Sequence, residues 1–148
     1  MLSFLRLNFI PASIDLGLLI LRLASAGAML WLHGRGKLMD LRDFDKAAQK
    51  FHAVMGTANV SLNAAKVSLG MAVFAEVLCA GLLILGLFGR FAALALAVTM
   101  GVAFVMVHKM ALTGAGNGEM AFLYLVPFVT LFFTGPGKFS VDGGAGGK

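Results

Sequence analysis

Four long runs of apolar residues divide the chain and restrict the folds that it can adopt. They cover residues 16–32, 67–88, 91–107 and 120–134. Each run is continuously apolar rather than alternating, which favours helices over membrane-spanning strands. About 20 helical residues cross the hydrocarbon core of a bilayer, so the second run is full length and the others need flanking residues. The sequence therefore predicts an all-α integral membrane four-helix bundle that crosses the bilayer several times.

The composition agrees with a membrane location. A mean hydropathy of +0.91 with 13% charged residues lies far outside the range of soluble proteins. We expect a single domain over residues 1–148, because no repeat or second compositional block interrupts the pattern. The net charge of +5 fits contact with anionic lipid headgroups better than nucleic acid, because no basic cluster is interleaved with stacking aromatic residues.

The segment of residues 38–64, between the first two runs, has an amphipathic pattern. Apolar residues recur there at close to helical spacing, with charged residues between them. They are Leu41, Phe44, Ala48, Phe51 and Met55. This pattern predicts an interfacial amphipathic helix in the first loop. The alternative is a polar cap over the mouth of the bundle that has no chemical role.

Arg22 and Glu76 are ionisable residues inside the apolar runs. A charge at the bilayer centre is unfavourable by roughly 2.5–3.5 kcal/mol on insertion scales, so each needs a partner or a wet site. The rise per residue puts the two side chains roughly 6 Å apart in depth, which a long Arg side chain can span. We predict that they form a buried pair, which either fixes helix packing or has a proton or substrate role.

Three further polar residues define a second layer near one membrane boundary. His33 ends the first run, His108 ends the third and Glu119 begins the fourth. Arg22 and His33 are eleven residues apart and therefore share one helix face. In the simpler interpretation, the polar ends of the two histidines contact water, and the Glu119 charge complements a helix dipole. The alternative is that these residues contact a ligand.

Other cofactors and metals are not expected. Two histidines at equal depth on different helices could bind one haem between them, but we do not expect a haem here. The chain has no short metal-ligand spacing such as H-E-x-x-H, so no metal site is predicted. Cys79 is the single cysteine, which excludes intramolecular dithiol exchange and is typical of a small packed hydrophobe.

A series of landmarks runs along the chain in a characteristic order. They are Leu19-Ile20-Leu21-Arg22-Leu23, His33-Gly34 with Lys37-Leu38, Glu76, Gly86-Leu87-Phe88-Gly89-Arg90, Val107-His108, Glu119, and Thr134-Gly135-Pro136-Gly137-Lys138-Phe139-Ser140-Val141-Asp142. With these landmarks the chain resembles the DoxX family of small four-helix membrane proteins over nearly its whole length. The resemblance implies a subunit of a sulfur or quinone redox system, such as a thiosulfate to quinone oxidoreductase, or a companion of oxidative-stress enzymes. It also implies the inner (cytoplasmic) membrane of a bacterium or archaeon.

We predict a membrane subunit of a redox system that binds a quinone and works with a soluble or peripheral partner. The expected cofactor-binding residues are Arg22, His33, Lys37, Glu76, His108, Glu119 and Tyr124. The histidines and Lys37 would donate hydrogen bonds to the quinone carbonyls, and Glu76 or Glu119 would relay protons. Phe104, Phe122 and Tyr124 would line the ring pocket. No catalytic residue is assigned, because the chain lacks a cysteine pair and a recognisable soluble catalytic module.

Two other function classes remain as alternatives. In a structural or assembly protein without a cofactor, the polar residues would only fix helix packing and the loop would dock a soluble partner. In a small transporter, the buried charges would line a pathway. Small residues on the second and third runs would also allow homo-oligomerisation through close helix contacts.

Overall fold

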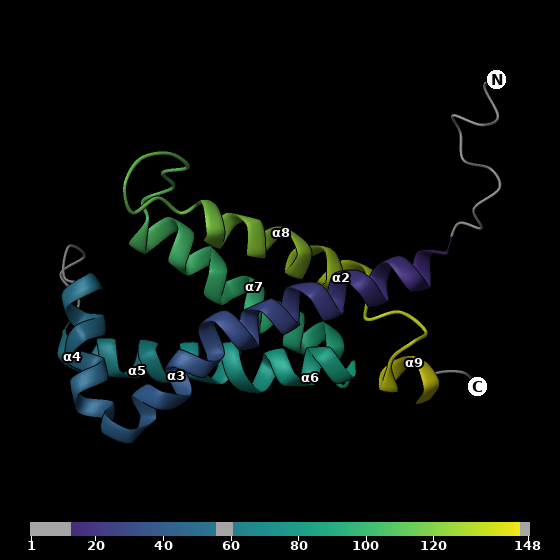
Figure 1. Ribbon diagram of the computed structural model, residues 1–148, viewed down its shortest axis with the longest axis horizontal. Helices are drawn as coiled ribbons and strands as arrows, with labels where there is room; N and C mark the ends of the chain where they lie inside the picture. The colour runs from purple at the N-terminus through teal and green to yellow at the C-terminus, as the bar shows by residue number, and fades with distance from the viewer. Residues whose placement is uncertain (1–12, 56–60, 146–148) are drawn as a thin grey trace.

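The computed structural model describes residues 13–55 and 61–145, and these residues form helices and no strands (Figure 1). The first long helical run comprises α2 (Ile14–Ala28), the π-helical turn η1 (Met29–Gly34) and α3 (Arg35–Asp40). It leads through the 3-10 turn η2 (Leu41–Asp43) into α4 (Phe44–Met55). The later helices are α5 (Leu62–Val73), η4 (Phe74–Cys79), α6 (Ala80–Leu85), α7 (Gly89–Val102), η5 (Ala103–Val107), α8 (Glu119–Thr134) and α9 (Val141–Ala145).

Local sequence signals explain where these helices begin and end. The Ser13 hydroxyl caps α2 by accepting a hydrogen bond from the Leu16 N–H at 3.2 Å, and Ser61 caps α5 in the same way. Gly86 ends α6 in the left-handed conformation, with φ of +68°, where glycine is favoured. Pro127 lies inside α8, which continues past it to Thr134. The predicted apolar runs therefore correspond to helices whose ends differ by a few residues.

Three helical segments of the described part are long and apolar enough to cross a membrane. They are Ile14–Ala53, whose apolar portion begins in α2 and continues into η1, together with Leu62–Leu85 and Gly89–Val107. The apolar helix α8 has 16 residues and is shorter than these three. These helices confirm the prediction of an all-α membrane protein.

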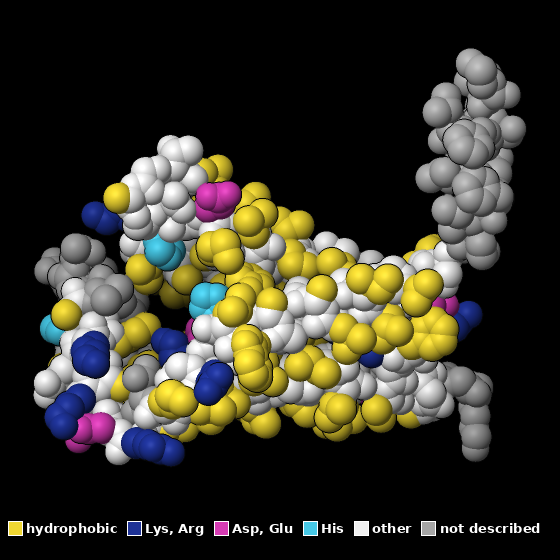
Figure 2. All heavy atoms as spheres, viewed as in Figure 1, with side chains coloured by type: hydrophobic (Ala, Val, Ile, Leu, Met, Phe, Trp, Pro, Cys, Tyr) yellow, Lys and Arg dark blue, Asp and Glu magenta, His cyan; other side chains and the backbone are white. Residues whose placement is uncertain are grey.

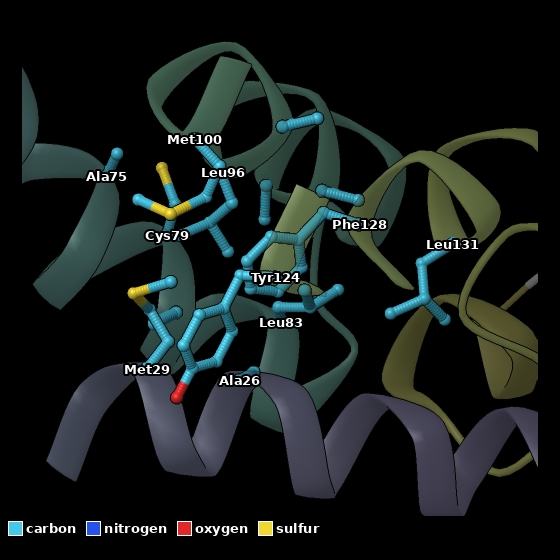
Figure 3. Packing of buried hydrophobic residues seen from close by; sticks show 14 residues of the cluster. Ala26, Met29, Ala75, Cys79, Leu83, Leu96, Met100, Tyr124, Phe128 and Leu131 are labelled. Atoms are coloured by element: carbon cyan, nitrogen blue, oxygen red, sulfur yellow. The ribbon is translucent and has the colours of Figure 1, made fainter. Parts of the chain in front are cut away.

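Small side chains fill the interior and large apolar side chains face outwards. The buried core contains six alanines, which allow the helices to approach closely, and Figure 3 shows its larger members between α2, α7 and α8. They include Leu83, Leu96, Tyr124, Phe128 and Leu131. Many leucine, valine and phenylalanine side chains are instead exposed on the long helices, where Figure 2 shows them as an apolar surface. This distribution suits a surface that faces lipid.

Helix α4 packs against α5 through its apolar side. Ala47 and Ala48 are buried against Leu69, with Phe44 and Phe51 beside them. Lys66 on α5 and Asp45 on α4 form an ion pair at 2.6 Å. The predicted amphipathic helix in the first loop is therefore present, while its position at a membrane interface stays a prediction. Figure 2 shows that Lys, Arg and His side chains gather at this end of the molecule, around a hollow.

Candidate functional site

Arg22 does not pair with Glu76, so that part of the prediction is wrong. The Arg22 side chain is 2% exposed and its guanidinium donates two hydrogen bonds to backbone carbonyls. Nη1 lies 2.9 Å from the Pro136 oxygen and Nη2 lies 2.7 Å from the Phe139 oxygen. The side chain is held at the end of the bundle that carries the chain's C-terminal segment. Arg22 is eleven residues before His33, about 16 Å along the helix.

The C-terminal segment of residues 136–142, here called the C-terminal clasp, closes this end of the bundle. The Asp142 carboxylate accepts hydrogen bonds from the Phe88 N–H at 3.0 Å and the Gly89 N–H at 2.7 Å, and thereby caps α7. The Asp142 N–H donates to the Gly86 carbonyl at 3.0 Å. A Cβ atom at Gly86 would collide with Arg22 Nη1 and Ser140 Cβ. Arg22 thus belongs to a structural unit and not to the predicted ligand site.

A cavity of about 380 Å³ lies at the opposite end, towards α3 and α4. Five of the seven predicted binding residues line it, namely His33, Lys37, Glu76, His108 and Tyr124. The remaining lining residues are Leu32, Gly36, Phe51, Met100, Ala103, Val107, Met120 and Ala121. We call this space the polar cavity. It brings together residues from seven helical elements, η1, α3, α4, η4, α7, η5 and α8, which the sequence order alone could not show.

Arg22 and Glu119 are the two predicted residues that do not line the polar cavity. Glu119 is exposed at the start of α8, where its backbone N–H donates to Asn117 Oδ1 at 3.1 Å. This position matches the simpler interpretation of Glu119 as a charge in the first turn of a helix.

Three π-helical turns surround the polar cavity. His33 lies in η1, Glu76 lies in η4, and Ala103 and Val107 lie in η5. A π-helical turn is rare and is frequently found at functional sites, because the extra residue changes the direction of the side chains around it. Apolar periodicity does not distinguish a π-helical turn from an α-helix, so the sequence prediction missed this feature.

Glu76 is buried without a hydrogen bond to one of its carboxylate oxygens. The residue is 7% exposed, and Oε2 has no partner among the described residues. Lys37 is a neighbouring charge that interacts electrostatically with both Glu76 and His33. The Lys37 ammonium also lies 4.9 Å from the centre of the Phe51 ring, a cation–π contact. Glu76 therefore places a carboxylate in the wall of the cavity, with one buried oxygen that has no hydrogen-bond partner among the described residues and with a cation close by.

The histidine and tyrosine side chains present both donors and acceptors. His108 Nδ1 lies 2.7 Å from the Gly116 carbonyl oxygen. Because a carbonyl only accepts, Nδ1 carries the hydrogen, and a neutral His108 has Nε2 as an acceptor. The predicted donor role of His108 therefore holds only for its protonated form. The His33 and Tyr124 rings meet edge to face at 5.5 Å, and Figure 3 shows the Tyr124 hydroxyl directed towards α2.

The aromatic lining differs from the prediction. Phe104 and Phe122 contact each other, with ring centres 5.5 Å apart, and neither lines the polar cavity. Phe51 of α4 lines it instead, beside Tyr124. The amphipathic pattern of the first loop already placed Phe51 on the apolar face of a helix. Only the packing of α4 on α5 brings that face to the cavity.

Gly34 sets the distance between η1 and η4 at the polar cavity. A Cβ atom at Gly34 would lie 2.6 Å from the Glu76 backbone oxygen and 3.1 Å from Leu30 Cδ1. We expect Gly34→Ala to push the two turns apart and to lower the stability by roughly 1–3 kcal/mol, as overpacking does. Thermal unfolding in mild detergent would measure this effect.

Gly27→Ala is the matched control for this prediction. A Cβ atom at Gly27, on the same helical run, would meet nothing within 4 Å. We expect this change to be neutral or to stabilise the helix by about 0.5–1 kcal/mol. Equal melting temperatures for the two variants would contradict the proposed close contact at Gly34.

Comparisons with known proteins identify the family. The DoxX family model matches residues 17–109, which is more than half of the chain and includes four of the five predicted residues that line the polar cavity. No curated protein and no solved structure gave a significant match. The apolar helices and the family model together indicate an integral multi-pass membrane protein. The chain belongs to the DoxX family.

Proposed function

We propose that the protein is a membrane subunit of a redox system that binds a quinone head group in the polar cavity. The observation that carries the proposal is the buried Glu76 carboxylate, whose Oε2 has no partner among the described residues and which lines that cavity. A buried carboxylate oxygen without a hydrogen bond destabilises a protein, so its presence favours a role for Glu76 in binding a ligand or in carrying a proton.

The residues at the cavity fit a quinone. Its volume of about 380 Å³ lies within the usual range of small-molecule sites, roughly 300–1,000 Å³. Lys37 and His33 are placed to donate hydrogen bonds to quinone oxygens, while Glu76 and neutral His108 accept them from the hydroxyl groups of a quinol. Apolar side chains and the aromatic rings of Phe51 and Tyr124 supply the remaining surface.

A quinone supplies redox chemistry by accepting two electrons and two protons to become a quinol. In this proposal the electrons come from a soluble or peripheral redox partner. The chain itself would hold the head group and provide a proton position at the Glu76 carboxylate. Lys37 would stabilise the negative charge that Glu76 carries when it is deprotonated, because the two residues already interact electrostatically.

The membrane arrangement that supports this function has four crossing helices. The 16 residues of α8 are about 24 Å long, so α8 would cross with the help of flanking residues, as the fourth helix beside α7. The basic side chains near α3 and α4 would meet anionic headgroups, with α4 at the interface. We propose that the protein lies in the inner membrane of a bacterium or archaeon. Its small residues would allow close helix contacts between copies in a homo-oligomer.

A fluorescence titration tests the proposal. Trp31 is the only tryptophan in the chain and lies on η1, two residues before His33. We expect a tail-less dimethoxy-methyl-benzoquinone to quench Trp31 fluorescence in detergent with a saturable dependence on concentration, because the quinone would bind beside His33, two residues along the chain from Trp31. N-acetyl-tryptophanamide in the same micelles corrects for absorption and for collisions within the micelle.

The same titration separates the proposal from the assembly alternative. A protein whose polar residues serve only helix packing would show quenching that rises in proportion to the quinone concentration, as free tryptophan does. That result, together with no quinone in solvent extracts of the purified protein, would overturn the proposed function.

A further inference from the structure

A groove between α5 and α7 reaches towards the polar cavity from the lipid-facing surface. It has a volume of about 530 Å³ and is bounded by α5 and η4 on one side and α7 on the other. Its lining is Val67, Gly70, Met71, Phe74, Ala75, Phe91, Leu94, Ala95, Val98 and Thr99. Six of these side chains are large, apolar and exposed, from 42% for Leu94 to 63% for Val67, so the groove opens on the apolar surface. We call it the α5–α7 groove.

A second cavity lies between the groove and the polar cavity and shares lining residues with each. It has a volume of about 220 Å³ and shares Met71, Val98 and Thr99 with the α5–α7 groove. On its other side it shares Phe51, Glu76, Ala103 and Val107 with the polar cavity. Glu76 therefore lines both the polar cavity and the second cavity, and the second cavity has a mostly apolar lining and shares a wall with the groove on the lipid-facing surface.

The lining of the groove suits a hydrocarbon chain. It contains no charged side chain, and its one hydroxyl, Thr99 Oγ1, already donates to the Ala95 carbonyl at 2.9 Å. A polar ligand would find no free hydrogen-bonding side chain there. A Cβ atom at Gly70 would meet nothing within 4 Å, so this position leaves space along the groove.

We propose that the α5–α7 groove binds the polyprenyl tail of the quinone whose head group occupies the polar cavity. This inference rests on the proposed function. The observation behind it is the series of three neighbouring cavities with shared walls, two of which Glu76 lines, because a membrane quinone joins a polar ring to an apolar tail and the protein places a polar and an apolar space in that order. A phospholipid acyl chain would fit the groove alone, but its charged headgroup would have no reason to follow the path to Glu76.

Photo-crosslinking tests the position of the tail. The probe is a benzoquinone with a ten-carbon chain that ends in a diazirine, added to the full-length protein in detergent. We expect crosslinks on the peptides of α5 and α7 that line the groove, and we expect an excess of unlabelled tail-bearing quinone to remove them. Crosslinks mainly on α2 or α8, or removal of the signal by phospholipid as readily as by quinone, would overturn the inference.

Gly70→Leu and Gly81→Leu form a matched pair of variants. Leu at position 70 fills the groove, whereas Gly81 lies on α6 outside its lining, and a Cβ atom at either position meets nothing within 4 Å. We expect Gly70→Leu to reduce crosslinking about tenfold, the scale of an overpacking effect, and Gly81→Leu to leave it unchanged. Unchanged crosslinking in Gly70→Leu would contradict a tail in this groove.

The tail-less quinone separates the two possible failures. If it quenches Trp31 with a saturable dependence in wild type and in Gly70→Leu, the head-group site exists and the crosslinking result decides the tail site alone. If neither quinone gives saturable binding to the wild-type protein, the proposed function fails, and the tail inference fails with it.

Discussion

Replacing Arg22 with methionine is expected to destabilise the protein by about 3 kcal/mol, because two buried hydrogen bonds from a charged donor are lost. Methionine keeps an unbranched apolar stem but has no donor, so the carbonyl oxygens of Pro136 and Phe139 would be left without their partner. The C-terminal clasp would then lose its attachment to α2. Thermal unfolding in mild detergent should show a melting temperature that is lower by several degrees.

Arg42→Met is the control for this prediction, because Arg42 is an exposed arginine on η2. The melting temperature of Arg42→Met should equal that of the wild-type protein. Arg22→Lys should fall between the two, since an ammonium cannot reproduce the two-point contact of a guanidinium. A melting temperature of Arg22→Met equal to that of wild type would show that the clasp contributes nothing to stability. Binding of the tail-less quinone to folded Arg22→Met should be unchanged, because Arg22 lies outside the polar cavity.

Replacing Glu76 with glutamine is expected to lower the affinity for quinol by about tenfold or more, with no loss of stability. A hydrogen bond to a charged acceptor contributes roughly 1.5–3 kcal/mol, and glutamine replaces the carboxylate by a neutral group of the same shape. The oxidised quinone should lose less affinity, because the glutamine amide can donate to its carbonyl. The melting temperature should stay the same or rise, because a buried charge without a hydrogen bond at Oε2 is removed.

Equilibrium binding of a radiolabelled, tail-less quinol under reducing conditions would measure this effect. Glu119→Gln is the matched control, because it makes the same chemical change at an exposed residue outside the polar cavity. The prediction is contradicted if both variants bind quinol as wild type does. A large fall in the melting temperature of Glu76→Gln would instead support the structural alternative for this residue.

The two substitutions therefore have opposite expected signatures. Arg22→Met should lower stability and preserve ligand binding, whereas Glu76→Gln should lower ligand binding and preserve stability. The structure gives the reason, since Arg22 has two hydrogen-bonding partners and Glu76 Oε2 has none among the described residues. A single buried pair would have made both residues behave alike.

Much of the fold followed from the sequence because hydropathy is a local property. The runs at residues 67–88 and 91–107 correspond to the helices Leu62–Leu85 and Gly89–Val107, and the amphipathic pattern of the first loop predicted α4. The depth of each polar residue along its helix also follows from the rise per residue. Five of the seven predicted residues, His33, Lys37, Glu76, His108 and Tyr124, line one cavity, and their role in binding a ligand stays a prediction.

The partners of the buried charges could not be found in the same way. Depth arithmetic put Arg22 within reach of Glu76, but it does not specify in which direction a long side chain points. The carbonyl groups that Arg22 contacts are 114 and 117 residues away in the sequence, in a segment without regular hydropathy. Packing decides whether Arg22 contacts the Glu76 carboxylate or these two carbonyls, which are far from Arg22 in the sequence but close to it in space.

By itself, the sequence determined that the chain is helical and apolar enough for a membrane, which family it resembles, and which residues carry charge at which depth. These properties depend on side-chain chemistry and on the regular geometry of a helix. Only the tertiary structure decided that Arg22 holds the C-terminal clasp, that three π-helical turns surround one cavity, and that Glu76 lies between a polar and an apolar space. These features depend on which helix faces meet, and the contacts that select those faces join residues far apart in the chain.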